Sequence, residues 1–399
     1  MEKAAQHTIC FAGHHFYEEK QGGVELQIRY LGKALAQSGW KVAFIAPSRN
    51  GENGHEKINE NIHLWRYPHF SYGYQAPGAL IEKQLEAIRP TVIYQRGRGQ
   101  LQESRVVLRY ARQHAIPYAF ALSSDADLER LSFTKTILSA PKPLWKKASL
   151  LPCSYWADHA MQQVLRQADY LIAQHEGQET EIKKKLRRQA LLLRTMHPAL
   201  ERESRKFDHK LVLFVTNYRP WKQGELFVRL AERCKHLNCL FVIVLGRTKP
   251  EYVEPVFREA QGKANLTIWG ELPTYKVENL MEDAALFVNT SLGLEGFPNT
   301  FVQCWLRETP TVSLHVNPGG VLTREKIGLH SGSFEQLVQD VTYLIEHDHE
   351  RIEMGKRARL YAEQAHGFEY NVNKIADIFA NMATKNRASS GSHHLKVMS

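Results

Sequence analysis

Strand and helix patterns alternate along this chain, and that alternation constrains the fold more than any other feature. An apolar run at residues 8–12, a helical stripe over residues 24–38 and a second apolar run at residues 41–47 form a strand–helix–strand unit with short connections. Such a unit places its two strands parallel in one sheet. Further strands are predicted at residues 62–67, 91–95, 118–122 and 170–174, with helical patterns between most of them. The first half is therefore predicted to be a doubly wound α/β domain.

A polar, highly charged stretch at residues 201–210 interrupts the alternation, which then starts again. Strands of the second series are predicted at residues 211–216, 240–246, 266–270, 285–291 and 311–314, with helices near 222–235, 251–262, 275–282 and 299–307. We therefore predict two Rossmann-like domains, residues 1–203 and 204–367. A final helical pattern falls within residues 368–385, and the composition of residues 386–399 predicts a disordered tail.

Composition limits the functional classes. The 399 residues carry a net charge of +10, which calls for an anionic partner such as a phosphorylated substrate, a membrane surface or nucleic acid. Nucleic acid ranks last, because the sequence has no zinc-finger spacing, no RNP-type motif and no long basic tract. The five cysteines form no CxxC pair, so reduced thiols are expected. No apolar run approaches about 20 residues and no signal peptide is evident, so we expect a cytoplasmic protein.

The segment EGFPNTFVQ at residues 295–303 combines a turn, a helix start and several polar groups. An apolar strand leads into it, and a helix is expected to begin near Pro298. Backbone N–H groups at the start of a helix, with the positive end of its dipole, form a phosphate site. Candidate residues for binding such a phosphorylated ligand are Gly296, Phe297, Pro298, Asn299, Thr300 and Gln303. Glu295 is a candidate for hydrogen bonding to a sugar, and the alternative is a carboxylate that caps its own loop.

Two other loops at predicted strand ends carry candidate phosphate ligands. Arg219 and Lys222 follow the first strand of the second domain, where two cations could neutralise a diphosphate. The alternative is a solvated loop pair. Gly22 and Gly23 precede the first helix, where the backbone could approach an anion or a sugar closely. A glycine pair without GxGxxG is also typical of a plain turn.

Charged residues also follow two strands of the first domain. Asp125 and Asp127 form a DxD pattern that imitates a metal site. We expect no metal there, because the pattern follows a strand of the first domain and the second domain already offers cations for a diphosphate. We expect Asp125 to line a ligand cleft formed by the strand ends of the two predicted domains. Arg96 and Arg98 could meet an anionic acceptor, although surface arginines would look the same. The basic stretches PKPLWKKASLL and KKKLRR are candidates for contact with anionic lipid, or plain exposed helix faces.

The chain resembles the retaining, nucleotide-sugar-dependent glycosyltransferases of family 4, which have the GT-B fold. The resemblance rests on the first strand–helix–strand unit, on NYRPWKQGELF and NLTIWGELP, and above all on NTSLGLEGFPNTFVQCWLRETPTVS, which is close to the E-x₇-E region of that family. It extends over nearly the whole chain. It implies a GT-B-like fold with two Rossmann-like domains facing a central cleft, and a final helix that crosses back to the first domain.

The resemblance also assigns roles. Arg219 and Lys222 are expected to hold the donor diphosphate, Glu295 to contact the donor sugar, and the N–H groups near Asn299 and Thr300 to receive the distal phosphate. Gly22 and Gly23 would border the donor phosphates and the acceptor. Such enzymes need no catalytic metal and no cofactor beyond the nucleotide diphosphate sugar. There are two departures from the family pattern. The second Glu of E-x₇-E is Gln303 here, and many relatives carry a histidine where this chain has Leu122-Ser123-Ser124, so that contact is missing or is supplied by Asp125. The candidate catalytic residues are therefore Glu295, Arg219, Lys222 and Asp125.

These expectations describe a hexosyltransferase-type enzyme that moves a sugar to a saccharide or lipid-linked acceptor in cell-envelope polysaccharide or lipopolysaccharide synthesis. It could contact the inner face of the membrane peripherally. Two alternatives remain open at this point: a nucleotide-sugar epimerase or hydrolase on the same fold, and a non-catalytic nucleotide-sugar-binding protein.

Overall fold

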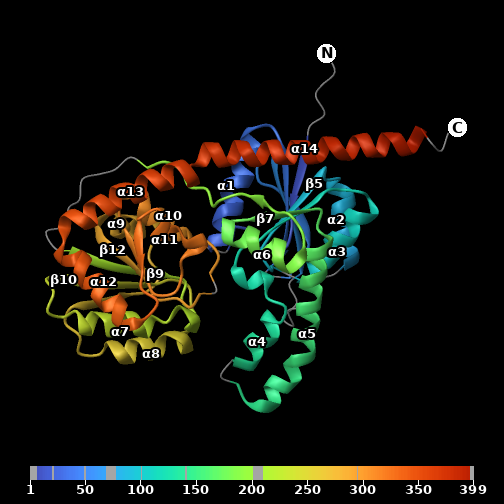
Figure 1. The fold of residues 1–399 in the computed structure, drawn as a ribbon. Coiled ribbons are helices and arrows are strands. Elements are labelled where there is room, and N and C mark those ends of the chain that lie inside the picture. The colour runs from blue at the N-terminus through green and yellow to red at the C-terminus, as the bar shows by residue number, and fades with distance from the viewer. Residues whose placement is uncertain are drawn as a thin grey trace. The chain divides into compact units, whose positions relative to one another are not determined.

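The computed structural model describes residues 7–19, 22–48, 51–68, 78–99, 101–139, 142–200, 210–293 and 295–395. The chain divides into two compact units (Figure 1). The first comprises the residues up to Met196 together with the segment from Glu369 onward, and the second comprises His197–Phe368. The division falls after Met196, seven residues before the boundary predicted after residue 203. Among the described residues, no helix has the length and apolar character needed to cross a bilayer.

The first unit is built on an eight-stranded sheet in the order β3-β4-β2-β1-β5-β6-β7-β8. All neighbouring strands pair parallel except β3 with β4. The strands are β1 Thr8–Phe11, β2 Lys41–Ser48, β3 Gly54–Lys57, β4 Ile62–Pro68, β5 Val92–Arg96, β6 Tyr118–Ala121, β7 Tyr170–Ala173 and β8 Leu191–Leu192. The helices are α1 Gly23–Gln37, α2 Gly78–Ile88, α3 Leu101–Gln113, α4 Ser132–Ser139, α5 Leu144–Gln167, α6 Glu176–Leu186 and α14 Phe368–Leu395, with a 3₁₀ turn at Asp125–Leu128.

Strand alternation sorts the core of this unit onto the two faces of the sheet. Cys10 and Ile93 lie in the apolar cluster that includes residues of α2, α3 and α5. Their neighbours Phe11 and Tyr94 contact each other, and Tyr94 also meets Phe379 of α14 with ring centroids 5.5 Å apart. The last helix is therefore part of the core of the first unit.

The second unit has a six-stranded, all-parallel sheet in the order β11-β10-β9-β12-β13-β14. Its strands are β9 Lys210–Thr216, β10 Cys239–Leu245, β11 Leu266–Trp269, β12 Ala284–Asn289, β13 Thr311–Ser313 and β14 Gly328–His330. Its helices are α7 Gly224–Arg233, α8 Pro250–Ala260, α9 Thr274–Asp283, α10 Asn299–Trp305, α11 Val321–Arg324, α12 Phe334–Glu346 and α13 Asp348–His366, with 3₁₀ turns at Pro220–Lys222 and Pro318–Gly320. The expected architecture of two doubly wound α/β domains is confirmed.

Strand order reverses once in each sheet, between β1 and β5 in the first unit and between β9 and β12 in the second. In doubly wound sheets, ligands bind outside the carboxyl ends of the strands at this reversal. The two reversals therefore indicate where the candidate site residues should gather within each unit.

The structure also differs from the sequence-based expectation at the C-terminal end and between β6 and β7. Helix α14 continues to Leu395, so residues 386–395 are helical where composition predicts a disordered tail. Residues 396–399 of that predicted tail lie outside the described residues. The stretch between β6 and β7, where the sequence predicts only an exposed helix face as an alternative for PKPLWKKASLL, folds into α4 and the 24-residue α5, which form a hairpin extending from the first unit (Figure 1).

Close backbone packing at Gly355 leads to one stability prediction. A Cβ added there would lie 2.1 Å from the carbonyl oxygen of Glu308, just after α10. We expect Gly355→Ala to lower the free energy of unfolding by about 1–3 kcal/mol, because this clash outweighs the gain of about 1 kcal/mol in helix propensity. Urea unfolding measures the change. Gly54→Ala is the control, because no heavy atom lies within 4 Å of its added Cβ; equal effects of the two substitutions would contradict the prediction.

Candidate active site

In the second unit, the loops after β9 and β12 are bound to each other at the reversal of strand order. The N–H of Leu292 donates to the carbonyl of Trp221 at 2.9 Å. The Thr290 hydroxyl donates to the carbonyls of Lys222 and Gln223 at 2.9 and 3.0 Å. These bonds fix the loop that carries Arg219 and Lys222 against the loop that carries Glu295.

An ion pair between Lys222 and Glu295 joins the two predicted donor-site residues. Their Nζ and Oε1 atoms are 2.7 Å apart, and the side chains are only 15% and 12% exposed. Asn289 donates to the same carboxylate oxygen from 3.4 Å, and Lys222 Nζ lies 4.2 Å from the centroid of the Trp221 ring. Glu295 thus contacts more than its own loop, and its carboxylate lies beside the cation expected to hold a diphosphate.

Arg219 lies at the start of the 3₁₀ turn that contains Lys222 and is exposed. Its Nη1 donates to the carbonyl of Tyr218 at 2.8 Å. Tyr218, just before the turn, is bonded to the start of α7. Its hydroxyl donates to Glu225 at 2.8 Å and accepts from the N–H of Gly224 at 3.3 Å. Burial and the neighbouring Glu225 raise the pKa of Tyr218. Arg219 and Lys222 therefore share a short, braced loop.

Two buried hydroxyls at the ends of the same strands were not predicted from the sequence. Thr216 is the last residue of β9, and Ser291 follows β12 by two residues. Neither Thr216 Oγ1 nor Ser291 Oγ has a hydrogen-bond partner among the described residues. A buried hydroxyl without a partner costs about 1–3 kcal/mol, so a polar ligand or water at these strand ends would be stabilising. The only sequence signal is a hydroxyl residue at the carboxyl end of each strand.

Helix α10 begins where the sequence predicts. Gly296, Phe297 and Pro298 are buried, Pro298 is the N-cap residue, and Asn299 is the first helical residue. Asn299 Oδ1 lies 3.1 Å from Nε2 of His197, the first residue of this unit. Thr300 and Gln303 are half-buried. Gln303 accepts through its backbone carbonyl from Arg307 at 3.0 Å. The predicted phosphate-binding turn is present as a buried turn that leads into a helix.

In the first unit, Gly22 and Gly23 occupy the start of α1. Gly22 is the N-cap residue with extended backbone at φ −152°, and Gly23 is the first helical residue. Any residue adopts such a φ, although a Cβ on Gly22 would meet Glu25 Oε2 at 2.4 Å. Residues 20 and 21, which belong to the same predicted loop, lie outside the described residues. The glycine pair is compatible with a plain turn, and its role at the donor stays a prediction.

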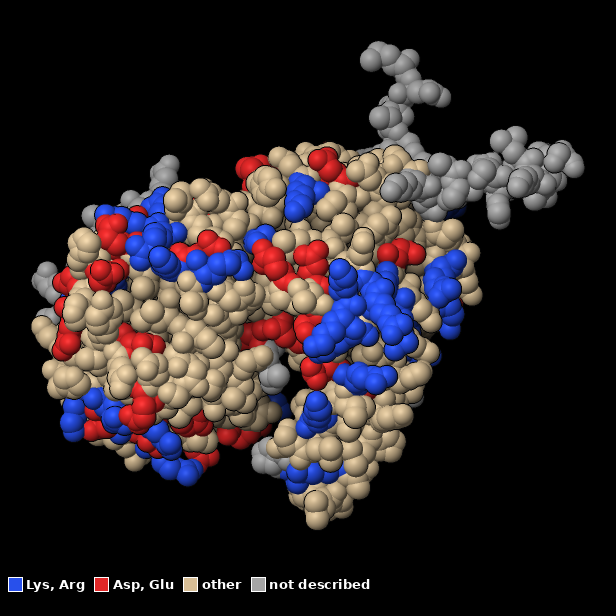
Figure 2. Space-filling view, viewed as in Figure 1, with Lys and Arg blue, Asp and Glu red and all other residues tan. Residues whose placement is uncertain are grey.

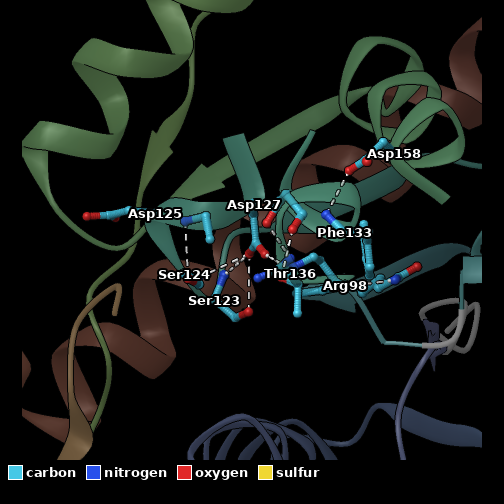
Figure 3. A network of polar contacts seen from close by, with 12 residues as sticks. Arg98, Ser123, Ser124, Asp125, Asp127, Phe133, Thr136 and Asp158 are labelled. Atoms are coloured by element: carbon cyan, nitrogen blue, oxygen red, sulfur yellow. Dashed lines mark hydrogen bonds and ion pairs between the residues drawn. The ribbon is translucent and has the colours of Figure 1, made fainter. Parts of the chain in front are cut away.

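The DxD pattern does not form a joint site, because its two carboxylates have separate partners. Figure 3 shows the Asp127 carboxylate with its partners and the Asp125 side chain pointing away from it. Asp127 is fully buried and accepts from the N–H groups of Ser123 and Ser124 at 2.7 and 3.1 Å. Burial raises the pKa of Asp127, against the opposing attraction of Arg98. Asp125 lies 3.1 Å from Nε2 of His175 at the start of α6 and accepts from Gln178 at 2.9 Å. No group of three metal-ligating side chains forms within the described ranges.

The two candidate acceptor-side arginines differ in their surroundings. Arg98 pairs with Asp127 at 2.9 Å, donates to Ser132 at 2.7 Å and lies over the ring of Phe133 (Figure 3). Arg96 is the last residue of β5 and is buried, and its N–H donates to His14 Nε2 at 2.9 Å. The guanidinium of Arg98 thus holds the 3₁₀ turn and α4 together, a structural role that the sequence did not indicate.

Glu103 is a further buried polar group near the reversal in the first sheet. It accepts from the N–H of Gly13, which follows β1, at 2.6 Å and from the Tyr67 hydroxyl at 2.5 Å. Burial raises the pKa of Glu103 to about 7, although both hydrogen bonds oppose that rise. The carboxyl therefore anchors the loop after β1 and titrates near neutral pH.

This raised pKa predicts a specific pH dependence of stability. The folded protein holds the Glu103 proton more tightly than the unfolded chain does. The protonated carboxyl therefore contributes fully to the free energy of unfolding below 4.5, the pKa in the unfolded chain, and this contribution is lost as pH rises through about 7. We expect the free energy of unfolding of the starting protein to fall by about 3 kcal/mol between pH 5 and pH 8 because of Glu103. In Glu103→Gln, which cannot titrate at this position, this fall should be absent. Denaturant unfolding of both proteins at the two pH values measures these changes. The same change in the free energy of unfolding in both proteins would contradict the prediction.

Comparison with known proteins places this geometry in context. The description "Glycosyl transferase 4-like domain" matches residues 22–196, and "Glycosyl transferases group 1" matches residues 198–361. No curated protein sequence matches the chain. The two matched domains and the paired Rossmann-like sheets define a glycosyltransferase of the GT-B type. The chain belongs to the family-4-like glycosyltransferases.

Three solved structures show the same fold. Sucrose-phosphate synthase from Thermosynechococcus elongatus superposes with a TM-score of 0.75 at 15% identity, covering 95% of this chain and 100% of the other. HepE from Anabaena, in complex with UDP-glucose, gives 0.68 at 14% identity and covers 94% and 99%. WaaG, a glycosyltransferase involved in lipopolysaccharide biosynthesis, gives 0.66 at 15% identity and covers 93% and 99%. At these identities the likeness shows the fold alone.

Proposed function

We propose that this protein transfers a hexose from a nucleotide diphosphate sugar to a saccharide or lipid-linked acceptor, with retention at the anomeric carbon and without a metal ion. The observation that carries the proposal is the Lys222–Glu295 ion pair, held at 2.7 Å where the strand order of the second sheet reverses. A cation for the diphosphate and a carboxylate for the sugar hydroxyls are the two groups a donor site requires, and here they are adjacent.

The proposed reaction breaks the bond between the anomeric carbon and the oxygen of the distal phosphate. Charge develops on the departing diphosphate, and the cations of Lys222 and Arg219 stabilise it more strongly as it grows. The acceptor oxygen attacks from the face that the leaving group vacates, and its proton passes to the departing phosphate. Two protein cations supply the neutralisation for which a divalent metal would otherwise be needed, which supports a metal-independent reaction.

The donor follows from the same site. A bound diphosphate that pairs with Lys222 would break the Lys222–Glu295 ion pair. The Glu295 carboxylate could then accept hydrogen bonds from sugar hydroxyls. The complexes of HepE with UDP and with UDP-glucose support a nucleotide diphosphate sugar as donor. Gln303, in place of the second carboxylate of E-x₇-E, offers the nucleotide a neutral hydrogen bond instead of a charge-assisted one.

The proposed acceptor and pathway are supported by the net charge of the chain and by one protein with the same fold. The net charge of +10 favours an anionic acceptor or surface. WaaG shares the fold and is involved in lipopolysaccharide biosynthesis, which supports a role for this chain in assembly of cell-envelope polysaccharide or lipopolysaccharide.

A thermal-shift screen against nucleoside diphosphates and their sugars, followed by turnover assays in chelator, tests the proposal. We expect one nucleotide to raise the melting temperature, since a ligand at 100 times its Kd stabilises by about 2.7 kcal/mol. The anomeric configuration of the product, read by NMR, tests retention.

Other outcomes would replace the proposal. Release of an epimer or free sugar without an acceptor would indicate an epimerase or a hydrolase. Tight nucleotide binding without turnover of any donor would indicate a binding protein, the function that Gln303 favours among the alternatives. Loss of turnover in chelator, restored by magnesium, would overturn metal independence.

A further inference from the structure

We propose that the end of the α4–α5 hairpin docks on an anionic membrane surface. The hairpin end is defined here by the exposed apolar side chains of Leu138, Leu144 and Trp145 and by Lys142 and Lys146. This inference does not depend on the proposed sugar transfer, because it concerns a surface formed by the first unit alone.

The hairpin end contributes nothing to the core of the first unit. Helix α4 has no buried residue, and the first buried residue of α5 is Ser154, ten positions after the helix begins. The ribbon in Figure 1 shows the two helices leaving the body of the unit together. A segment that stabilises no core and still exposes apolar side chains is typical of an interaction surface.

The exposed side chains are large and apolar. Leu144 is 83% exposed, Trp145 73% and Leu138 52%. Single exposed apolar residues are common on protein surfaces, but here Leu144 and Trp145 are adjacent and lie at the start of α5, across the turn from Leu138 at the end of α4. Tryptophan is enriched at the membrane–water interface because its ring is apolar and its N–H is polar.

The charge of the hairpin matches an anionic surface. Residues 130–157 contain five lysines and arginines and no aspartate or glutamate. The whole chain has 42 acidic residues among 399, so a stretch of this length would carry about three at the average frequency. On the face shown in Figure 2, the hairpin carries basic and uncharged side chains. Apolar side chains flanked by lysines are the combination that inserts into an anionic bilayer interface.

The second basic stretch, at the end of α6, is a weaker candidate because the structure uses its charges internally. Lys185 pairs with Glu129 and Glu181, each at 3.1 Å. Arg188 donates to the backbone carbonyls of Leu165, Arg166 and Asp169. The observations therefore favour the hairpin end as the membrane contact.

Cosedimentation of the full-length protein with lipid vesicles tests the proposal. We expect binding to phosphatidylcholine vesicles that contain about one-third phosphatidylglycerol, and weaker binding to phosphatidylcholine alone or when salt is raised from about 0.1 to 0.5 M. Leu144→Glu should weaken binding at least tenfold, because it removes an inserted side chain and adds a repelled charge. Lys142→Gln with Lys146→Gln should weaken it about 30-fold, since each lysine near such a surface contributes roughly a factor of five.

Matched variants elsewhere control for general effects of charge. Leu360→Glu changes a leucine of α13 that is 56% exposed, and Lys83→Gln with Lys235→Gln removes two exposed lysines outside the hairpin. Both controls should bind vesicles as the unchanged protein does. The proposal is overturned if the unchanged protein does not sediment with anionic vesicles, or if hairpin and control variants lose affinity equally. It is also overturned if Leu144→Glu instead abolishes a dimer seen by light scattering, which would assign the hairpin end to a second copy of the chain.

Discussion

With Lys222 holding the donor diphosphate as proposed, we expect Lys222→Ala to lower kcat/KM for the donor by roughly 10²–10³, the typical cost of removing one group that stabilises charge in a transition state. Lys222 Nζ lies 2.7 Å from the Glu295 carboxylate, and the loop that carries the lysine is hydrogen-bonded to Thr290 and Leu292. Steady-state kinetics with the donor identified by thermal shift measures the effect, and most of it should appear in kcat.

Lys249→Ala is the matched control, because Lys249 lies in the same unit and its side chain is 64% exposed. Its kcat/KM should stay within a factor of two of the starting protein's, a range smaller than 0.5 kcal/mol. Combining Lys222→Ala with Glu295→Gln should cost less than the sum of the single changes, since the two groups contact each other. Full activity in Lys222→Ala would remove the lysine from the donor site.

We expect Asp127→Ala to lower the free energy of unfolding by about 3–5 kcal/mol, because removing the buried carboxylate leaves the groups bonded to it without a partner. The lost carboxylate bonds Arg98 and the N–H groups of Ser123 and Ser124. An apparent melting temperature lower by roughly 6–20 °C is expected for a unit of this size. Differential scanning fluorimetry measures it.

Asp125→Ala controls for this prediction two residues away. The Asp125 side chain is 44% exposed and contacts His175 and Gln178. An exposed pair contributes about 0–1 kcal/mol, so this variant should melt within a few degrees of the starting protein. Equal losses for the two aspartates would show that Asp127 does not anchor the turn as described.

Much of the fold follows from sequence periodicity. Predicted strands of six or seven residues reappear with end shifts of one or two residues, as for β2, β4 and β9, because each is rich in apolar and aromatic residues. Strands β3, β8 and β14 were missed, since they have two to four residues and depend on neighbours that periodicity does not identify. The hairpin was not placed by range, because α4 buries no residue and α5 buries residues only from Ser154 onward, so the first turns of α5 show no buried apolar stripe.

The candidate site was predictable in position but less so in its contacts. Arg219, Lys222 and Glu295 follow β9 and β12, and the carboxyl ends of these strands lie together once the strand order is known. Nothing in the sequence indicates that Lys222 and Glu295 pair directly. Arg98 and Asp127 are 29 positions apart in the sequence. Only the folded chain shows that Arg98, predicted to bind the acceptor, pairs with the Asp127 carboxylate instead. The roles of the individual site residues stay predictions.

Helix α14 determines the order in which the two units can complete their folding. Val372, Ile375 and Phe379 are buried within the first unit, although the ribosome makes them after the whole of the second unit. A nascent chain that has completed residue 196 therefore still exposes the apolar surface around Trp40 and Tyr94 that Phe379 later covers. Domains usually fold in the order in which they emerge. Here the domain whose synthesis begins first is completed only after the second domain has been made.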